Sequence, residues 1–530
     1  MVDNSNLAYK FTEVEKEIDY TYLPDQLKYT SVSLTEVFNN KLRLEASAFS
    51  IEAKFAKEKI LNNKNGYKYA WSKDGFIENC FYGGRAKRNY VAKNTEGAVG
   101  FLGSAEMLNI YPKAVKYLSS NVINIVPFKV DKGTILISRS GTIGKVTFVN
   151  DTLSKNLISE HAIRIIAKEY AGYLFTFFQT ETGQTLVKSN IFGAVVDQIE
   201  PQHFEKIVVP NAPESLKKEI HELVIDSYDL RDESNNLIDH AEQILYEELQ
   251  LKPIEELKTE YFDNSVDLRN YTTKLSNLRL RLDSSYHIPM VQLVEQEIKR
   301  HAKEISTIGQ LSKDVILAGV FKRTYVDSEN GVPFLGGRDI TQLNPQVEKF
   351  LSKSVHATRI KKELAVFENY VLISDRGTIG KVQIVPKHWT GWAVSQNIIK
   401  VIANSNDIAG YLFCFFNSDY GQILIKRETY GSVVDMIDDK NVNGIHVPLL
   451  KNEKKQKEIN DLVLQANELR YQAHLKEQEA IKKMENIINT TNDNKFSIAL
   501  KHLHSNSEID QLVYQLYELT EEEIKIVEGD

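Results

Sequence analysis

Two long segments of the chain repeat apolar residues with the seven-residue period of packed helices. Every seventh residue from Ile220 reads Ile, Ser, Ser and Ala, and every seventh residue from Leu223 reads Leu, Leu, Leu and Ile. This pattern predicts one long helix with a single apolar seam, about 54 Å long over residues 214–249. Residues 452–490 predict a second such helix, with alanine at several seam positions. A single helix would expose its narrow apolar seam to water. The two helices are therefore expected to pack on each other.

Short β-branched and aromatic runs, separated by glycine turns, precede each long segment. Residues 122–126, 134–138 and 147–150 have the composition of strands. Residues 172–188 carry aromatic residues at helical spacing and predict one amphipathic helix, which Gly183 breaks or tightens. The aromatic stripe is expected to be core. Each half of the chain is therefore predicted to mix helices and strands.

The chain contains one domain twice. Residues 135–146, ILISRSGTIGKV, share nine of twelve positions with residues 371–382, VLISDRGTIGKV. Because the matching segments keep the same order over about 170 residues, they predict a duplicated domain rather than a short-period solenoid. The other pairs are RLEASAF and RLDSSYH, AKRNYV and FKRTYV, FLGSAEM and FLGGRDI, GYLFTFFQTETGQTLVK and GYLFCFFNSDYGQILIK, and GAVVDQI and GSVVDMI.

The repeated GTIGK stretch lacks the residues of a phosphate-binding loop. Such a loop needs a glycine, four residues, then Gly-Lys and a serine or threonine. The first copy has Arg139 and Val146 at the outer positions, and the second has Asp375 and Val382. The apolar runs on both sides predict instead the turn of a β-hairpin, in which glycine supplies a positive φ.

Composition limits the class of protein. A chain of 530 residues is too long for one core, and its 42% hydrophobic and 26% charged residues are typical of globular domains. Two distant cysteines predict neither a disulfide framework nor a cysteine-rich zinc site. With no apolar run of membrane-spanning length and no secretory apolar region, a cytoplasmic location without a membrane partner is expected. The formal charge of −7 means that any DNA surface must be local.

The sequence shows no catalytic signature. It has no Asn/Asp-Pro-Pro-aromatic tetrapeptide of an amino-methyltransferase, no HExxH, no G-x-S-x-G and no dinucleotide fingerprint. A duplicated catalytic site should also keep its acid, base or nucleophile in both copies. The first copy has His161, but the second has Asn397 at the corresponding position. We therefore predict no catalytic residues, no cofactor and no metal site, and a stand-alone enzyme is disfavoured.

Basic residues gather beside aromatics and glycines in both copies. GGRAKRNYVAK, from Gly83, has four basic residues and no acid, and VFKRTYV repeats Lys-Arg beside a tyrosine. Such loops suit contacts to phosphates and base edges, although each alone is equally typical of a solvated charged loop. The predicted DNA-binding residues are Arg85, Lys87, Arg88, Arg139, Lys145, Lys322, Arg323, Arg338, Arg376 and Lys381.

The repeated GTIGK, GYLF and G(S/A)VVD segments, each followed by a long helix, resemble the specificity subunits of Type I restriction–modification systems, which act in phage defence. The resemblance covers residues 40 to 490. It implies a non-catalytic subunit in which each half is a target-recognition domain that reads one part of a split double-stranded DNA site. The two helices would form an antiparallel coiled coil that sets the spacing and docks two DNA adenine-methyltransferase subunits. Restriction/translocase subunits could join the same complex.

These patterns predict an α+β protein with two mixed α/β target-recognition domains in tandem, each followed by a long helix. A duplicated scaffold or binding module of another defence complex, without direct DNA reading, is the alternative. The expected parts are an N-terminal extension (1–39), recognition domain 1 (40–212), helix 1 (213–255), recognition domain 2 (270–450), helix 2 (452–490) and a helical tail (491–530).

Overall fold

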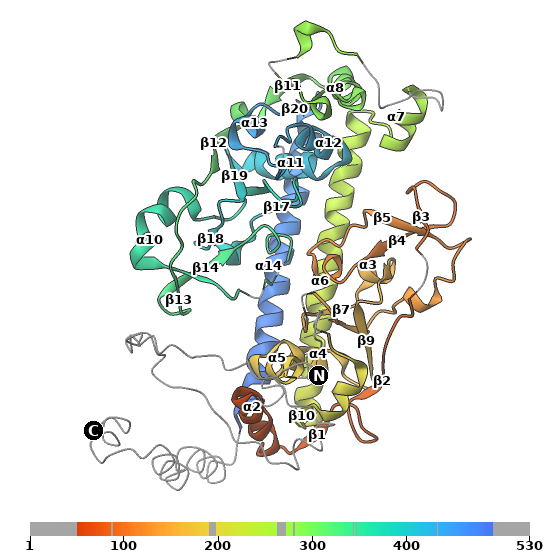
Figure 1. Ribbon diagram of the computed structural model, residues 1–530, viewed down its shortest axis with the longest axis vertical. Helices are drawn as coiled ribbons and strands as arrows, with labels where there is room; N and C mark the ends of the chain where they lie inside the picture. The colour runs from red at the N-terminus through yellow and green to blue at the C-terminus, as the bar shows by residue number, and fades with distance from the viewer. Residues whose placement is uncertain are drawn as a thin grey trace, which may run out of the picture.

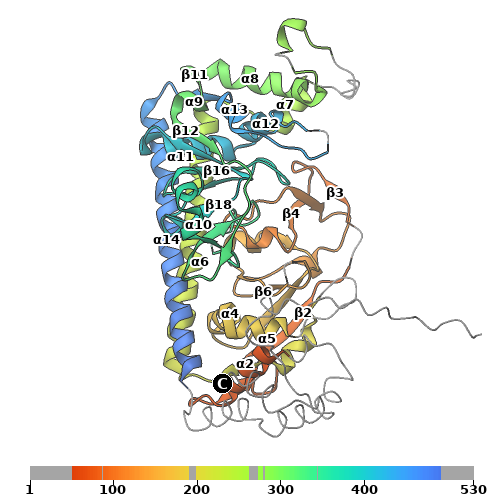
Figure 2. The ribbon, with the colours of Figure 1, turned by 60° about the vertical axis from the view of Figure 1, so that its left-hand side comes forward.

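Two long helices lie side by side in the computed structural model, and the rest of the protein packs against one face of this pair (Figures 1 and 2). The structure describes residues 50–490 except for 86–87, 142, 190–197, 262–271, 279–280, 343, 346 and 432. The expected N-terminal extension and C-terminal tail lie outside these residues. The first half below is the part before the first long helix, and the second half is the part between the two.

The long helices are α6 (Glu214–Glu248) and α14 (Glu453–Asn489). They run in opposite directions, since Glu219 pairs with Lys483 while Asp226, further along α6, pairs with Lys476. The seam between them is made of small side chains. The Ser227 hydroxyl donates to the backbone oxygen of Ala473 over 2.8 Å. The α6 residues Ile220, Ser227, Ser234 and Ala241 and the α14 residues Ala466, Ala473 and Ala480 are all fully buried.

The described residues of the first half form three sheets. A four-stranded sheet has the order β2, β9, β6, β7, a smaller one the order β3, β5, β4, β8, and β1 pairs with β10. The strands are β1 (Tyr67–Tyr69), β2 (Ile77–Tyr82), β3 (Tyr90–Val91), β4 (Ala98–Leu102), β5 (Lys116–Ser119), β6 (Ile135–Ser138), β7 (Val146–Phe148), β8 (Leu157–Ile158), β9 (Ala162–Ala167) and β10 (Val208–Pro210). The helices are α2 (Ile51–Leu61), α3 (Asp151–Ser154), α4 (Ala171–Gln179) and α5 (Glu181–Lys188), with 3₁₀ turns η3 (Glu106–Leu108), η4 (Val126–Phe128) and η5 (Pro201–Lys206).

The second half repeats this topology strand for strand. Its sheets have the orders β12, β19, β16, β17 and β13, β15, β14, β18, and β11 pairs with β20. The strands are β11 (Glu304–Thr307), β12 (Ser312–Leu317), β13 (Tyr325–Val326), β14 (Gly331–Leu335), β15 (Phe350–Ser352), β16 (Val371–Ser374), β17 (Val382–Ile384), β18 (Ala393–Val394), β19 (Ile398–Ala403) and β20 (His446–Leu449). The predicted mixture of helices and strands is confirmed.

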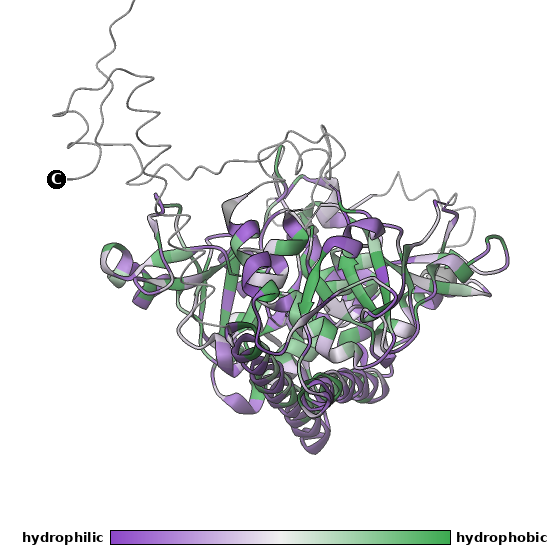
Figure 3. Ribbon diagram, turned by 90° about the horizontal axis from the view of Figure 1, so that it is seen from below, coloured by the Kyte–Doolittle hydropathy of each residue, from purple (hydrophilic) through white to green (hydrophobic). Residues whose placement is uncertain are grey.

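Helices cover the second half as they cover the first. They are α7 (Ile254–Tyr261), α8 (Pro289–His301), α9 (Ile308–Leu311), α10 (Lys353–Arg359), α11 (Asn406–Asn417), α12 (Asp419–Arg427) and α13 (Asp439–Asn443). Shorter turns are η6 (Leu275–Asn277), η7 (Ser284–His287), η8 (Ile360–Leu364) and η9 (Lys387–Trp389). Seen end-on in Figure 3, the outer side of the long helices is hydrophilic, and hydrophobic residues gather in the sheets above them.

Each GTIGK stretch is a hairpin turn, as predicted. In the first half, Ile137 pairs with Val146 in antiparallel register, and in the second Ile373 pairs with Val382. Gly141 and Gly144 have φ of 81°, and Gly377 and Gly380 have φ of 72° and 82°. These left-handed conformations are strained for residues with a side chain, which explains the glycines.

The repeated GYLF segments dock each half onto its long helix. Gly172 begins the close approach of α4 to α6, and its backbone NH donates to His221 Nδ1 over 3.0 Å. Gly410 places α11 against α14 in the same way, donating to Asn460 Oδ1 over 2.9 Å. A Cβ on Gly410 would lie 2.4 Å from the backbone oxygen of Asn460. Glycine is therefore required by the distance between backbones, while the following aromatics fill the core.

Two local predictions are wrong. Residues 122–126 are not a strand, because Asn124 Oδ1 accepts from the backbone NH of Val126 in a turn that leads into η4. Residues 172–188 are two helices rather than one. Thr180 caps α5 by accepting from the NH of Gly183, and a Cβ on Gly183 would lie 2.0 Å from the oxygen of Phe177.

The two halves touch through equivalent connections, between β4 and β5 in one and between β14 and β15 in the other. The backbone NH of Ile110 donates to the oxygen of Thr341 over 2.7 Å, and the Thr341 hydroxyl donates to Asn109 Oδ1 over 2.8 Å. Across the same junction, Lys145 Nζ donates to Gln342 Oε1 over 3.4 Å. The two halves are thereby fixed to each other as well as to the helices.

Two buried arginines lie near the middle of the helix pair and differ in their partners. Arg231 of α6 forms an ion pair with the buried carboxylate of Glu477 and lies over the Tyr228 ring, 4.2 Å from its centroid. Arg470 of α14 is also buried, but none of its guanidinium nitrogens has a hydrogen-bond partner among the described residues. Burial accordingly lowers the pKa of Arg470. An unpaired buried charge destabilises the folded state.

We expect Gly410→Ala to lower the free energy of unfolding by about 1–3 kcal/mol, because the added methyl group forces α11 away from α14. The midpoint of urea unfolding, followed by circular dichroism, measures this. Gly444→Ala is the control, since its Cβ would meet no atom closer than 3.5 Å. Equal stability of Gly410→Ala and the natural protein would contradict the close approach.

The two arginines should respond in opposite directions to the same substitution. Arg470→Met removes an unpaired buried charge and should stabilise the protein by on the order of 1–4 kcal/mol. Arg231→Met leaves Glu477 without its cation and should destabilise it by about 3–5 kcal/mol. Urea midpoints of both variants at pH 7 test this pair. A loss of stability in Arg470→Met would show that Arg470 has a partner.

Candidate nucleic-acid interface

The small sheet of each half carries the same stack of cations and aromatic rings. In the first half, Lys116 Nζ lies 5.7 Å from the ring centroid of Tyr90, and Tyr90 packs edge-on against Phe101 at 6.5 Å. The Arg88 guanidinium lies on Phe101 at 5.1 Å. This arrangement, Lys–Tyr–Phe–Arg, is called the first stack below.

The second stack repeats these contacts residue by residue. Lys349 Nζ lies 5.8 Å from the Tyr325 ring, and Tyr325 packs against Phe334 at 6.0 Å. Arg323 lies on Phe334 at 5.4 Å. Since the two halves differ at many other surface positions, the repetition of four side chains in one geometry marks this surface as a candidate site.

Strand pairing creates each stack. In the first half Phe101 of β4 is directly opposite Lys116 of β5, and Tyr90 of β3 is opposite Leu118 of β5. The phenylalanines are buried, while Tyr90 and Tyr325 are 48% and 40% exposed. Each stack therefore presents an accessible aromatic ring between two cations. Such a surface can stack on a base and contact phosphates.

The arginine of each stack has an acceptor on the loop that follows β8 or β18. Arg88 Nη2 donates to both carboxylate oxygens of Glu160, over 2.7 and 2.8 Å. Arg323 Nη2 donates to Gln396 Oε1 over 2.5 Å. Burial raises the pKa of Glu160, but the hydrogen bonds from Arg88 outweigh it, so the pKa lies below its ordinary value. Those bonds also raise the pKa of Arg88.

The larger sheet of each half contains a buried cation, Arg164 of β9 and Lys400 of β19, that the sequence analysis did not single out. The Arg164 guanidinium donates to the backbone oxygens of Ala162 and Ile158, over 3.0 and 2.6 Å. In the second half Lys400 Nζ donates to the oxygen of Ala365 over 3.1 Å. Burial lowers the pKa of Lys400 to about 8. Both residues occupy core positions of a strand. Their charge is the only feature of the sequence that could have identified them.

The predicted DNA-binding residues fall into three groups. Arg88 and Arg323 belong to the stacks, and Lys322 is exposed beside the second one. Arg85 is exposed near the first stack, and Lys87 lies outside the described residues. The sequence analysis predicted these arginines and noted the nearby tyrosines, but it did not identify the phenylalanines and lysines that complete the stacks. The tyrosine after each Lys-Arg pair was the available signal.

The residues of the GTIGK turns lie in other surroundings. Arg139 is buried, forms an ion pair with Glu200 and lies over the Tyr82 ring at 4.3 Å. Arg376 pairs with Asp375 over 3.0 Å and is partly exposed.

The remaining predicted cations stand near the junction of the halves. Lys145 reaches Gln342 there, as described above. Lys381 is partly buried, and this burial lowers its pKa. Arg338 is exposed.

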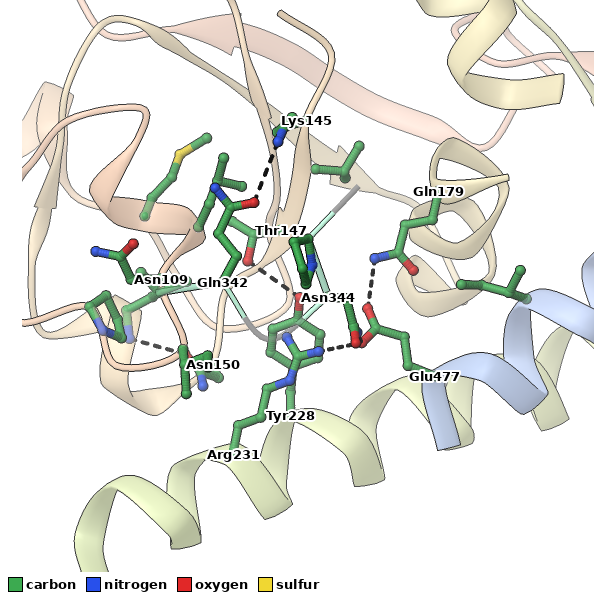
Figure 4. Close-up of a pocket in the computed structure, with 18 of the residues that line it drawn as sticks. Asn109, Lys145, Thr147, Asn150, Gln179, Tyr228, Arg231, Gln342, Asn344 and Glu477 are labelled. Atoms are coloured by element: carbon green, nitrogen blue, oxygen red, sulfur yellow. Dashed lines mark hydrogen bonds and ion pairs between the residues drawn. The ribbon is translucent and has the colours of Figure 1, made fainter. Parts of the chain in front are cut away.

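A cavity of about 210 Å³ lies where both halves meet the helices (Figure 4). Its polar side chains satisfy one another, since Glu477 accepts from Arg231, from Asn344 and, over 2.6 Å, from Gln179 Nε2. The Thr147 and Tyr228 hydroxyls are bonded over 3.3 Å. This network joins the parts of the fold and offers no catalytic pair.

Within the described residues, no three His, Cys, Asp or Glu side chains are grouped to hold a metal ion. Nor does any helix among them have the length and apolar character needed to cross a membrane. Cys80 and Cys414 are buried, and burial raises the pKa of both thiols.

Comparison with known protein families gives a match to one part of the chain. Residues 313–483 match the model of the Type I restriction modification DNA specificity domain. A search of curated protein sequences finds no match.

Two solved structures align with most of the chain. The S subunit of a Type I restriction–modification system from M. genitalium aligns over 81% of this chain and 97% of its own, with 12% identity and a TM-score of 0.31. The HsdS subunit from Thermoanaerobacter tengcongensis aligns over 79% of this chain and 98% of its own, with 11% identity and a TM-score of 0.25. Such scores add no independent argument, so the assignment rests on the family model.

The matched residues run from β12 into α14 and include the second copies of GTIGK, GYLF and G(S/A)VVD. The resemblance drawn from those segments is confirmed over residues 313–483, which match the Type I restriction modification DNA specificity domain.

Proposed function

We propose that this protein is a non-catalytic DNA-specificity subunit whose two halves each read one part of a split double-stranded DNA site. The observation that carries the proposal is the repeated Lys–Tyr–Phe–Arg stack on a repeated fold, one copy of which lies in a DNA specificity domain. Lysine and arginine suit phosphates, and arginine beside a polar acceptor suits base edges. In this proposal the stacks face DNA.

The helix pair would serve as the spacer between the two reading domains, packed as an antiparallel coiled coil. With 35 residues in α6, the helix is about 52 Å long by its rise per residue. The hydrophilic outer side of the pair, opposite the two halves, is the surface we assign to the methyltransferase subunits (Figure 3). Two such subunits, and restriction/translocase subunits in a complete system, would supply the chemistry.

The ten predicted DNA-binding residues have three different roles in this proposal. Arg88, Lys322 and Arg323 are assigned to direct contact, together with Lys116, Tyr90, Lys349 and Tyr325 of the stacks. Arg85, Lys87, Arg338 and Arg376 are assigned to surrounding phosphates. Arg139, Lys145 and Lys381 are assigned to holding the turns and the junction, because each is buried or partly buried near another part of the protein.

Selection from a pool of random-sequence duplexes should recover a motif with two specified parts separated by a fixed gap. The reason is that two domains held by one rigid helix pair can reach only bases at a constant separation. Sequencing the DNA bound by the purified full chain measures this. A continuous short palindrome would contradict two-part reading, and no enriched sequence would favour the alternative, a scaffold that does not read DNA.

Replacing both basic residues of the second half, Lys322→Ala with Arg323→Ala, should weaken binding to the selected duplex and flatten its salt dependence. Each lost phosphate contact lowers the slope of log affinity against log salt by about 0.9, so two give up to about 1.8. Fluorescence anisotropy at several salt concentrations measures both quantities. The control is Lys218→Ala with Lys457→Ala, two exposed lysines on the long helices. Unchanged affinity and slope would remove these residues from the interface.

A further inference from the structure

The two stacks contain the same four residue types. They differ in the residue that accepts hydrogen bonds from the arginine. The acceptor is a carboxylate, Glu160, in the first half and a carboxamide, Gln396, in the second. Both residues stand at the second position of a three-residue loop, Ser-Glu-His or Ser-Gln-Asn, that leads into β9 or β19. The backbone of this loop is also alike, since residues 161 and 397 each donate to the hydroxyl of the preceding serine, over 3.4 and 3.3 Å.

This substitution changes the charge held beside each stack, where Glu160 is buried and Gln396 is partly buried. Glu160 neutralises Arg88, so the first stack keeps the charge of Lys116 alone. Gln396 is neutral, so Arg323 and Lys349 both keep their charge in the second. Two further charged or titratable groups lie near Glu160. One is His161, whose Nε2 lies 3.8 Å from Glu160 Oε1 and whose Nδ1 lies 2.8 Å from Ser140 Oγ. The other is the buried guanidinium of Arg164, whose charge interacts with that of Glu160.

The difference between Glu160 and Gln396 also changes which base edges each stack can bind. A carboxylate only accepts hydrogen bonds, so it matches amino groups of cytosine or adenine and opposes the acceptors of guanine and thymine. A carboxamide whose oxygen is held by Arg323 still offers its NH₂ group as a donor. No described residue accepts a hydrogen bond from that group.

We infer that Glu160 and Gln396 are specificity-determining residues, and that they make the two parts of the DNA site differ. The Glu160–Arg88 pair reads an amino-bearing base with little net charge. The Gln396–Arg323 pair reads an acceptor edge and retains one more cation for the DNA backbone. The inference rests on the proposed function. It adds that each of the two residues determines the preferred base in only one part of the site.

The test exchanges the two acceptors. Glu160→Gln and Gln396→Glu are each compared with the natural full chain in selection from random-sequence duplexes and in salt-dependent binding to the selected duplex. Both variants should fold, since each copies an arginine–acceptor pair already present in the other half, and thermal unfolding checks this. Glu96→Gln is the control, because Glu96 is exposed in the turn between β3 and β4 and its replacement changes the total charge as Glu160→Gln does.

Glu160→Gln should change the preferred base in one part of the motif only, by about 5- to 150-fold, the range of one side chain–base contact. It should also steepen the salt slope by about 0.9, because Arg88 is released from its carboxylate. Gln396→Glu should alter the other part and flatten the slope by a similar amount. Glu96→Gln should leave the motif unchanged.

The inference is overturned if Glu160→Gln and Gln396→Glu select the natural motif with the slope of the Glu96→Gln control, or if either changes both parts alike. These results differ from failure of the proposed function, in which the natural chain itself selects no motif. A structural role alone would alter the unfolding temperature without altering base preference.

Discussion

The close packing of α6 against α14 is the contact on which the rest of the structure depends. Serine and alanine in the seam let the helix backbones approach, and glycine at the start of each GYLF segment lets α4 and α11 approach the same pair. Every one of these contacts is between backbones or very small side chains, where one added methyl group has nowhere to go. These steric limits place each half on the helix pair, and the hydrogen bonds across the junction fix the halves to each other.

The two halves share their backbone structure but differ in the ion pairs that they form. The sheets, the hairpin turns and the helix docking are repeated almost without change, while ionic partners are not. Arg231 has a carboxylate and Arg470, at the matching place on α14, has none among the described residues. The buried Arg139 pairs with the partly exposed Glu200 in one half, where the other has Asp375 and Arg376 side by side. Backbone geometry tolerates little variation, whereas polar contacts can be exchanged one at a time.

The stacks show how such exchanges could alter recognition without altering the fold. Their tyrosines occupy equivalent positions in the strand register of both halves. The acceptor that contacts the arginine comes from a loop, and a change from carboxylate to carboxamide there disturbs no packing. A rigid platform with one variable polar residue can therefore present a different hydrogen-bonding pattern to a ligand while keeping its position.

The sequence by itself determined the repeat, the mixture of helices and strands, the long helices and the glycine turns. These features depend on local backbone limits and on periodic burial, which are visible in neighbouring residues. It did not reveal that Arg139 is buried against Glu200, or that Tyr90, Phe101, Lys116 and Arg88 form one stack. It also placed a strand at residues 122–126, where an asparagine turn prevails. Only the tertiary structure decided these points, because charge pairing and aromatic stacking join residues from different strands and loops, whose distances no local pattern encodes.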